Sequence, residues 1–164
     1  MTLGDIATKV KMCYPTTGRT TEECDRALRL FGGLSRPDKS RIQRFYSDTE
    51  RGLITAARAL GILCRQSQPG RSVTNSRAER NNEDVLAGAR CLLAAAGLPE
   101  CFWPYAAPYY CLMENLCYNK DGVRKYVAWA GEDFPAEIIP FGALIEYIPP
   151  TTRKQDHNGK WGNT

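Results

Sequence analysis

Histidine and paired cysteines are scarce in this sequence of 164 residues, and their scarcity excludes several kinds of site. The one histidine, His157, stands in a polar tail, so neither a Cys/His zinc site nor a Ser-His or Cys-His catalytic pair is expected. The seven cysteines are an odd number and include no Cys-x-x-Cys pair. This pattern favours reduced, mostly buried thiols in an intracellular protein over a disulfide framework.

Long apolar runs are also missing. The run CLLAAAGL (91–98) is among the longest, and it is far shorter than a membrane span. The first residues, MTLGDIATKVKMCYP, do not resemble a secretory signal. We therefore expect no membrane partner.

Acidic residues are absent from residues 53–78, a segment that contains Arg58, Arg65, Arg71 and Arg77. A basic segment of this kind can bind a nucleic-acid backbone, although a solvated charged surface is the simpler alternative. The net charge of +4 and the pI near 8.7 are compatible with a nucleic-acid partner without establishing one.

Strand and helix patterns alternate along the chain, and an apolar fraction of 43% is enough for a packed core in one domain. This order predicts an α/β layered fold. Strands are expected at 9–14, 42–46, 62–64 and, as a last pair, 138–148, helices at 20–32, 53–60, 80–96 and 101–117, and a loose polar tail from 151.

Two carboxylates stand at positions where such folds place ligands. Asp48 directly follows the strand pattern IQRFYS, and Glu79 opens the long helix 31 positions later (79 − 48). Convergence of the two acids would suit Mg²⁺, which prefers carboxylate oxygens, and the dipole of a helix start also favours negative charge. The alternative is that Asp48 is a turn residue and Glu79 an ordinary helix-start acid.

Two stretches together resemble the catalytic core of copia-type retroelement integrases: FYSDTERGLITAARALGI (45–62) and SQPGRSVTNSRAERNNEDVLAGARCLLAAAGLPECFW (67–103). The resemblance covers roughly residues 45–118. Weaker similarity reaches DIATKVKMCYP (5–15) on one side and IPFGALIEYIPP (139–150) on the other. The combined order of motifs is specific, although no single motif is.

This resemblance implies a ribonuclease-H-like fold with a mixed sheet and flanking helices. It also implies DNA strand transfer by Mg²⁺ or Mn²⁺ ions held on three carboxylates. Asp48 matches the second carboxylate and Glu79 the third, and both would be catalytic residues and metal ligands. The residues expected to contact DNA are Arg65, Arg71, Arg77, Arg80 and Asn82.

The departures from the family are as informative as the matches. The first catalytic Asp belongs on a central strand upstream of Asp5, so that strand and its carboxylate are missing from the chain. Asp5 matches a non-catalytic position, and Asp25 falls in a predicted helix. Ser76 replaces the usual Gly, the turn after Asp48 differs, and the spacing from Asp48 to Glu79 is shorter than in the family.

These departures leave three hypotheses. The chain is a truncated integrase core that is weakly active or inactive; or a competent enzyme whose first strand is encoded upstream in a polyprotein; or a non-catalytic DNA-binding or interaction domain. The predicted divisions are a partial core over 1–118, a post-core segment over 119–150 and a tail over 151–164. Homo-oligomers and a nuclear location are expected from the resemblance alone.

Overall fold

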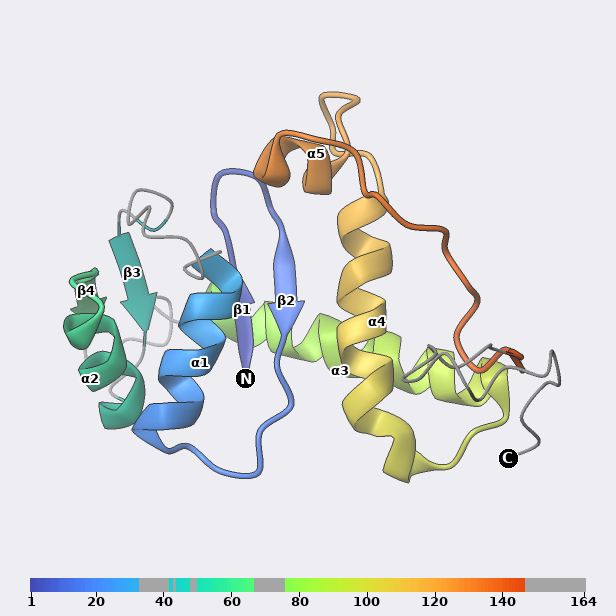
Figure 1. The fold of residues 1–164 in the computed structure, drawn as a ribbon, viewed down its shortest axis with the longest axis horizontal. Coiled ribbons are helices and arrows are strands. Elements are labelled where there is room, and N and C mark those ends of the chain that lie inside the picture. The colour runs from blue at the N-terminus through green and yellow to red at the C-terminus, as the bar shows by residue number, and fades with distance from the viewer. Residues whose placement is uncertain (33–41, 43, 48–49, 67–75, 147–164) are drawn as a thin grey trace, which may run out of the picture.

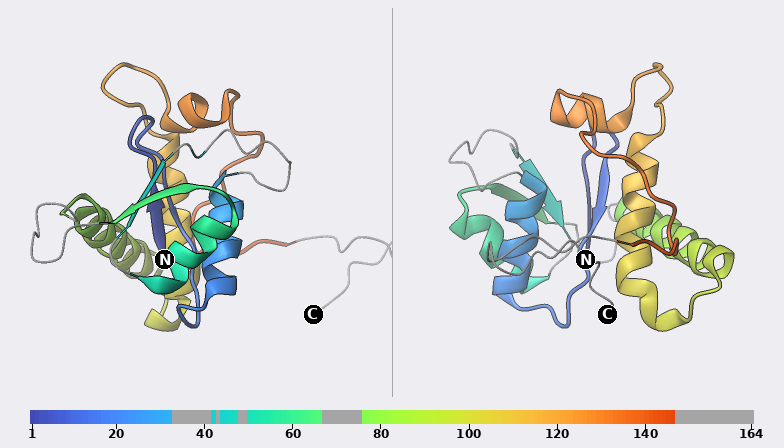
Figure 2. Two further views of the ribbon diagram at one scale, coloured as in Figure 1. Left: turned by 90° about the vertical axis from the view of Figure 1, so that its left-hand side faces the viewer. Right: turned by 45° about the vertical axis from the view of Figure 1, so that its right-hand side comes forward.

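The structure, a computed structural model, describes residues 1–32, 42, 44–47, 50–66 and 76–146 (Figure 1). The described strands form two separate two-stranded sheets, one antiparallel and one parallel. Helices lie on both sides of the antiparallel pair, with α1 on one side and α3 on the other, as the two views in Figure 2 also show. The predicted α/β class is confirmed at this level, although the described strands do not join into one mixed sheet.

The chain opens with a hairpin of β1 (Thr2–Gly4) and β2 (Lys11–Cys13), in which Leu3 lies opposite Met12. β2 lies within the predicted strand at 9–14, whereas β1 was not predicted. Asn115 in α4 covers the outer edge of β2: its side chain accepts a hydrogen bond from the Lys11 amide (2.9 Å) and donates one to the Lys11 carbonyl (2.7 Å).

The next part consists of α1 (Thr21–Gly32), β3 (Arg44–Ser47), α2 (Arg51–Ala59) and β4 (Leu63–Gln66). A capping box starts α1, since the Glu23 amide donates to the Thr20 hydroxyl and the Thr20 amide donates to the Glu23 carboxylate. β3 and β4 pair in parallel through the crossover helix α2. One hydrophobic cluster holds these elements together, and its buried residues are Leu3, Cys24, Ala27, Leu28, Leu53, Ala56, Ala57 and Ile62.

The long helix α3 (Ser76–Ala96) ends at Gly97, whose φ of 64° suits glycine because it has no Cβ. A 3-10 turn, η2 (Glu100–Phe102), leads into α4 (Trp103–Leu116), which continues through Pro108. α3 and α4 cross closely at Gly88, where a Cβ would clash with the Tyr110 ring. A second hydrophobic cluster joins these helices to β2, with Cys13, Val85, Ala89, Leu93, Ala106, Ala107 and Cys111 buried.

The last described part contains α5 (Lys125–Ala130), a short helix that the sequence pattern did not predict. The strand pair predicted at 138–148 is wrong for residues 138–146, which contain no strand. Of the seven free cysteines, three are buried and three are exposed, so the prediction of mostly buried thiols is confirmed only in part.

Candidate nucleic-acid interface

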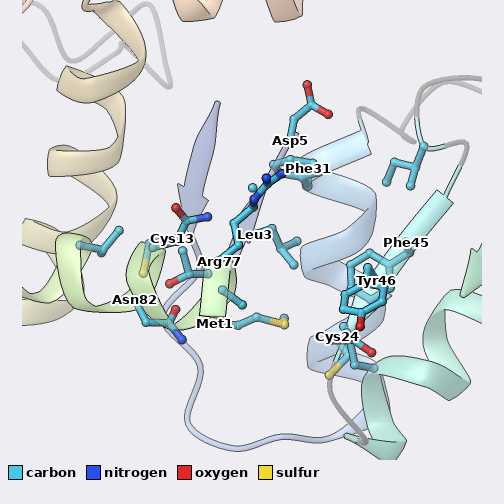
Figure 3. A pocket seen from close by; sticks show the side chains of 18 of the residues that line it. Met1, Leu3, Asp5, Cys13, Cys24, Phe31, Phe45, Tyr46, Arg77 and Asn82 are labelled. Carbon is cyan, nitrogen blue, oxygen red and sulfur yellow. The ribbon is translucent and has the colours of Figure 1, made fainter. Parts of the chain in front are cut away.

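A cleft with a volume of about 1190 Å³ separates the two sheets. Its walls come from the hairpin β1–β2, from α1, from the parallel strand β3 and from the first turns of α3 (Figure 3). Segments that are distant in the sequence therefore border one space, and the start of α3 lies along it.

Four arginines line this cleft. Arg19 pairs with Glu50, whereas the other three come from three different elements: Arg44 in β3, Arg65 in β4 and Arg77 in α3. All three are exposed, and none forms an ion pair with any residue that the structure describes. Among the described residues, no acid neutralises these three charges, and arginines of this kind are suited to bind an anionic ligand such as a phosphate backbone.

The acids along the same walls already have partners. Asp5 accepts hydrogen bonds from the amide (2.7 Å) and hydroxyl (2.6 Å) of Thr8, and these bonds leave its pKa below the ordinary value although burial alone would raise it. Glu50 pairs with Arg19 at 3.2 Å. Of these two acids, Glu50 is therefore paired with a cation, whereas Asp5 keeps its charge and is held by neutral hydrogen-bond donors.

The predicted DNA-binding residues divide into three groups. Arg65, Arg77 and Asn82 line the cleft, so three of the five predicted side chains meet there. Arg80 is exposed on α3 and is not part of the lining. Arg71 lies outside the described residues.

Sequence reasoning missed Arg44 as a member of this group. The sequence placed Arg44 within a predicted short strand, but the alternation of side chains along a strand does not show which face borders a cleft. In the structure it lies opposite Leu63 of β4, at the start of β3.

The structure describes only one of the two predicted catalytic acids. Glu79 lies in the first turn of α3, as predicted, where its side chain is exposed and does not line the cleft. Asp48 lies outside the described residues, so the structure does not test whether the two acids meet. Their chain neighbours do border one space, since Ser47 and Ala78 both line the cleft.

An ion pair between Lys11 of β2 and Asp84 fixes α3 against the hairpin. The Tyr110 hydroxyl also donates to Asp84, at 3.1 Å. Burial works to raise the pKa of Asp84, but the hydrogen bond and charge of Lys11, together with Tyr110, hold this pKa below its ordinary value. These contacts place the start of α3 beside the cleft.

Metal ligands are sparse in the described part of the chain. No three His, Cys, Asp or Glu side chains among the described residues form a group that could hold a metal ion. Mg²⁺ takes carboxylate oxygens in near-octahedral geometry, and of the two predicted ligands only Glu79 is described. The described residues therefore do not by themselves make up a magnesium site.

None of the helices in the described ranges is long and apolar enough to span a bilayer. Comparison with protein-family models gives no match, and comparison with curated proteins gives no significant match. The case for a function therefore depends on the cleft and on the sequence motifs that surround it.

Proposed function

We propose that this chain is a nucleic-acid-binding domain of retroelement integrase type, with a ribonuclease-H-like ancestry, that binds DNA and performs little or no strand transfer alone. The observation that carries the proposal is the meeting of Arg44, Arg65 and Arg77 in one cleft without ion-pair partners among the described residues. Phosphate contacts supply most of non-specific DNA affinity, and unpaired arginines are suited to make them.

The arrangement of strands supports the integrase part of this proposal. After the hairpin and α1, a parallel β-α-β unit is followed by two long helices, and this part of the order agrees with the strand, helix, strand and long helix of the resemblance. The described strands form two separate sheets. Homo-oligomerisation and a nuclear location belong to the same proposal.

DNA binding is tested by salt titration of Arg65→Ala and Arg77→Ala. Each substitution should weaken binding similarly for unrelated sequences and reduce the salt slope by about 1, because one phosphate contact is lost. The matched control is Arg26→Ala, since Arg26 is exposed on α1 outside the cleft. Equal affinity and slope for the cleft variants and the control would refute the proposed interface.

The chemical part of the proposal predicts no Mg²⁺-dependent joining of DNA ends by residues 1–164, because no carboxylate in this segment matches the first one of the family pattern. Robust joining that disappears in Asp48→Asn or Glu79→Gln would overturn this prediction.

If Asp48 and Glu79 hold Mg²⁺, both substitutions should remove a Mg²⁺-dependent part of DNA affinity. Affinity that is unaffected by Mg²⁺ and by both substitutions would favour the non-catalytic interaction domain. An upstream in-frame strand that carries an Asp would favour the competent enzyme, and the genomic sequence before Met1 can show whether one exists.

A further inference from the structure

The parallel sheet β3–β4 has an inner and an outer face. Phe45 lies opposite Cys64, and both side chains pack against the hydrophobic cluster around Leu28. Side chains alternate between the two faces of a strand, so the residues next to Phe45 and Cys64 point to the outer face. Four exposed residues occupy that outer face: Arg44, Tyr46, Leu63 and Arg65.

The outer face places an aromatic ring between two cations. Tyr46 lies directly opposite Arg65 of the neighbouring strand, and Arg44 precedes Tyr46 by two positions on the same face. Neighbouring strands are about 4.8 Å apart, and residues two positions apart along a strand are separated by about 6.6 Å. Both guanidinium groups can therefore reach a ligand that lies on the Tyr46 ring.

The Tyr46 ring is accessible to such a ligand. Tyr46 is 45% exposed, and Leu63 on the same face is 58% exposed. Among the residues that the structure describes, Tyr46 has no aromatic neighbour, and its hydroxyl has no hydrogen-bond partner. Within the same ranges, Arg44 and Arg65 form no ion pair. The outer face thus combines an exposed ring with positive charge.

This combination suits a single nucleic-acid strand better than a duplex. In a duplex the bases stack on one another, so an aromatic side chain reaches a base face only after that base leaves the stack. In a single strand the bases can stack on aromatic side chains while cations follow the backbone. Tyr46, Arg44 and Arg65 all line the cleft, so a strand bound there would enter the interface proposed above.

We propose that the outer face of β3–β4 is a stacking platform and that the chain therefore prefers single-stranded DNA to duplex DNA. One unpaired base stacks on Tyr46, with Leu63 adding apolar surface beside it, and the neighbouring phosphates contact Arg44 and Arg65. This inference rests on the proposed DNA interface and specifies the state of the strand that the interface binds.

The preference is measured by anisotropy with one labelled strand of about 12 nucleotides, alone and in a blunt duplex with its complement. We expect the full chain to bind the single strand at least about 5-fold more tightly than the duplex. An analogue of the same strand with abasic sites throughout keeps its phosphates but cannot stack. We expect the parent chain to bind this analogue about 10-fold more weakly than the intact strand.

Substitutions at Tyr46 test the platform directly. Tyr46→Ala should weaken binding of the single strand about 10-fold and binding of the duplex less than about 2-fold, because only the single strand stacks on the ring. Tyr46→Phe should recover most of the affinity, since it keeps the ring. The matched control is Tyr105→Ala, at an exposed tyrosine of α4 that does not line the cleft.

Equal affinity for the single strand and the duplex, or for the intact and the abasic strand, would overturn the platform. If Arg65→Ala weakens binding of both DNA forms while Tyr46→Ala changes neither, the DNA interface stands and the platform alone fails. Absence of salt-dependent binding to either form would refute the DNA interface itself, and the platform with it.

Discussion

At the scale of single residues, Asn115 is one of two buried polar residues in the described part of the chain. It is 3% exposed and satisfies both backbone groups of Lys11. Asn115→Ala leaves a donor and an acceptor without partners, at a cost of about 1 to 3 kcal/mol for each group. We therefore expect the free energy of unfolding in urea to fall by about 2 to 6 kcal/mol.

The control for this prediction is Asn82→Ala, an exposed position on α3 that should change stability by no more than about 0.5 kcal/mol. A loss below about 1 kcal/mol in Asn115→Ala would mean that water replaces the amide. Sequence reasoning did not single out Asn115, because its partner Lys11 is 104 positions away and nothing local indicates the contact.

At the scale of elements, the contact between α3 and the hairpin depends on the charge of Asp84. Its pKa in the folded chain is lowered, so its contribution to stability is complete above the ordinary value of about 3.9 and is lost as the pH falls through the folded pKa. We expect parent and Asp84→Asn to differ in unfolding temperature at pH 6 and to converge toward pH 2. A difference that stays constant over this range would contradict the assignment, and Lys11→Met should also abolish the pH-dependent part.

The elements that the sequence predicts best are the long helices. The apolar spacing in α3 and α4 extends over several turns, so it indicates a helix without reference to the rest of the chain. The strand β1 has three residues, one of them glycine, and exists because β2 pairs with it. The segment IIPFGALIEYI has strand-like residues, but residues 138–146 pair with no described strand, and isolated strands are not stable.

The local features of the candidate site were predictable from the sequence, whereas the placement of its side chains in one cleft was not. The arginine-rich composition and the helix start at Glu79 are local features, and both were predicted from the sequence. That Arg65 and Arg77 line one cleft while Arg80 does not depends on the direction of α3 relative to the sheets. This direction is set by contacts such as Lys11–Asp84, which span 73 positions.

At the scale of the whole molecule, the two hydrophobic clusters are joined mainly through the hairpin, since β1 belongs to one cluster through Leu3 and β2 to the other through Cys13. The two sheets are not paired across the cleft. We therefore expect the halves to unfold with incomplete cooperativity. Trp129 of α5 contacts Phe31, which packs on the first cluster, with ring centroids 6.4 Å apart, while α5 also contacts α4. Trp103 packs on the second cluster, so in single-tryptophan variants Trp129 reports the Phe31 contact and Trp103 reports the second cluster.

Leu28→Ala and Val85→Ala each weaken one cluster, because Leu28 is fully buried in the first and Val85 is 2% exposed in the second. Loss of a buried leucine costs about 2 to 5 kcal/mol. Leu28→Ala should shift the urea midpoint reported by Trp129 more than that reported by Trp103, and Val85→Ala should do the opposite. Equal shifts at both tryptophans would mean that the contacts between the halves couple them into one folding unit.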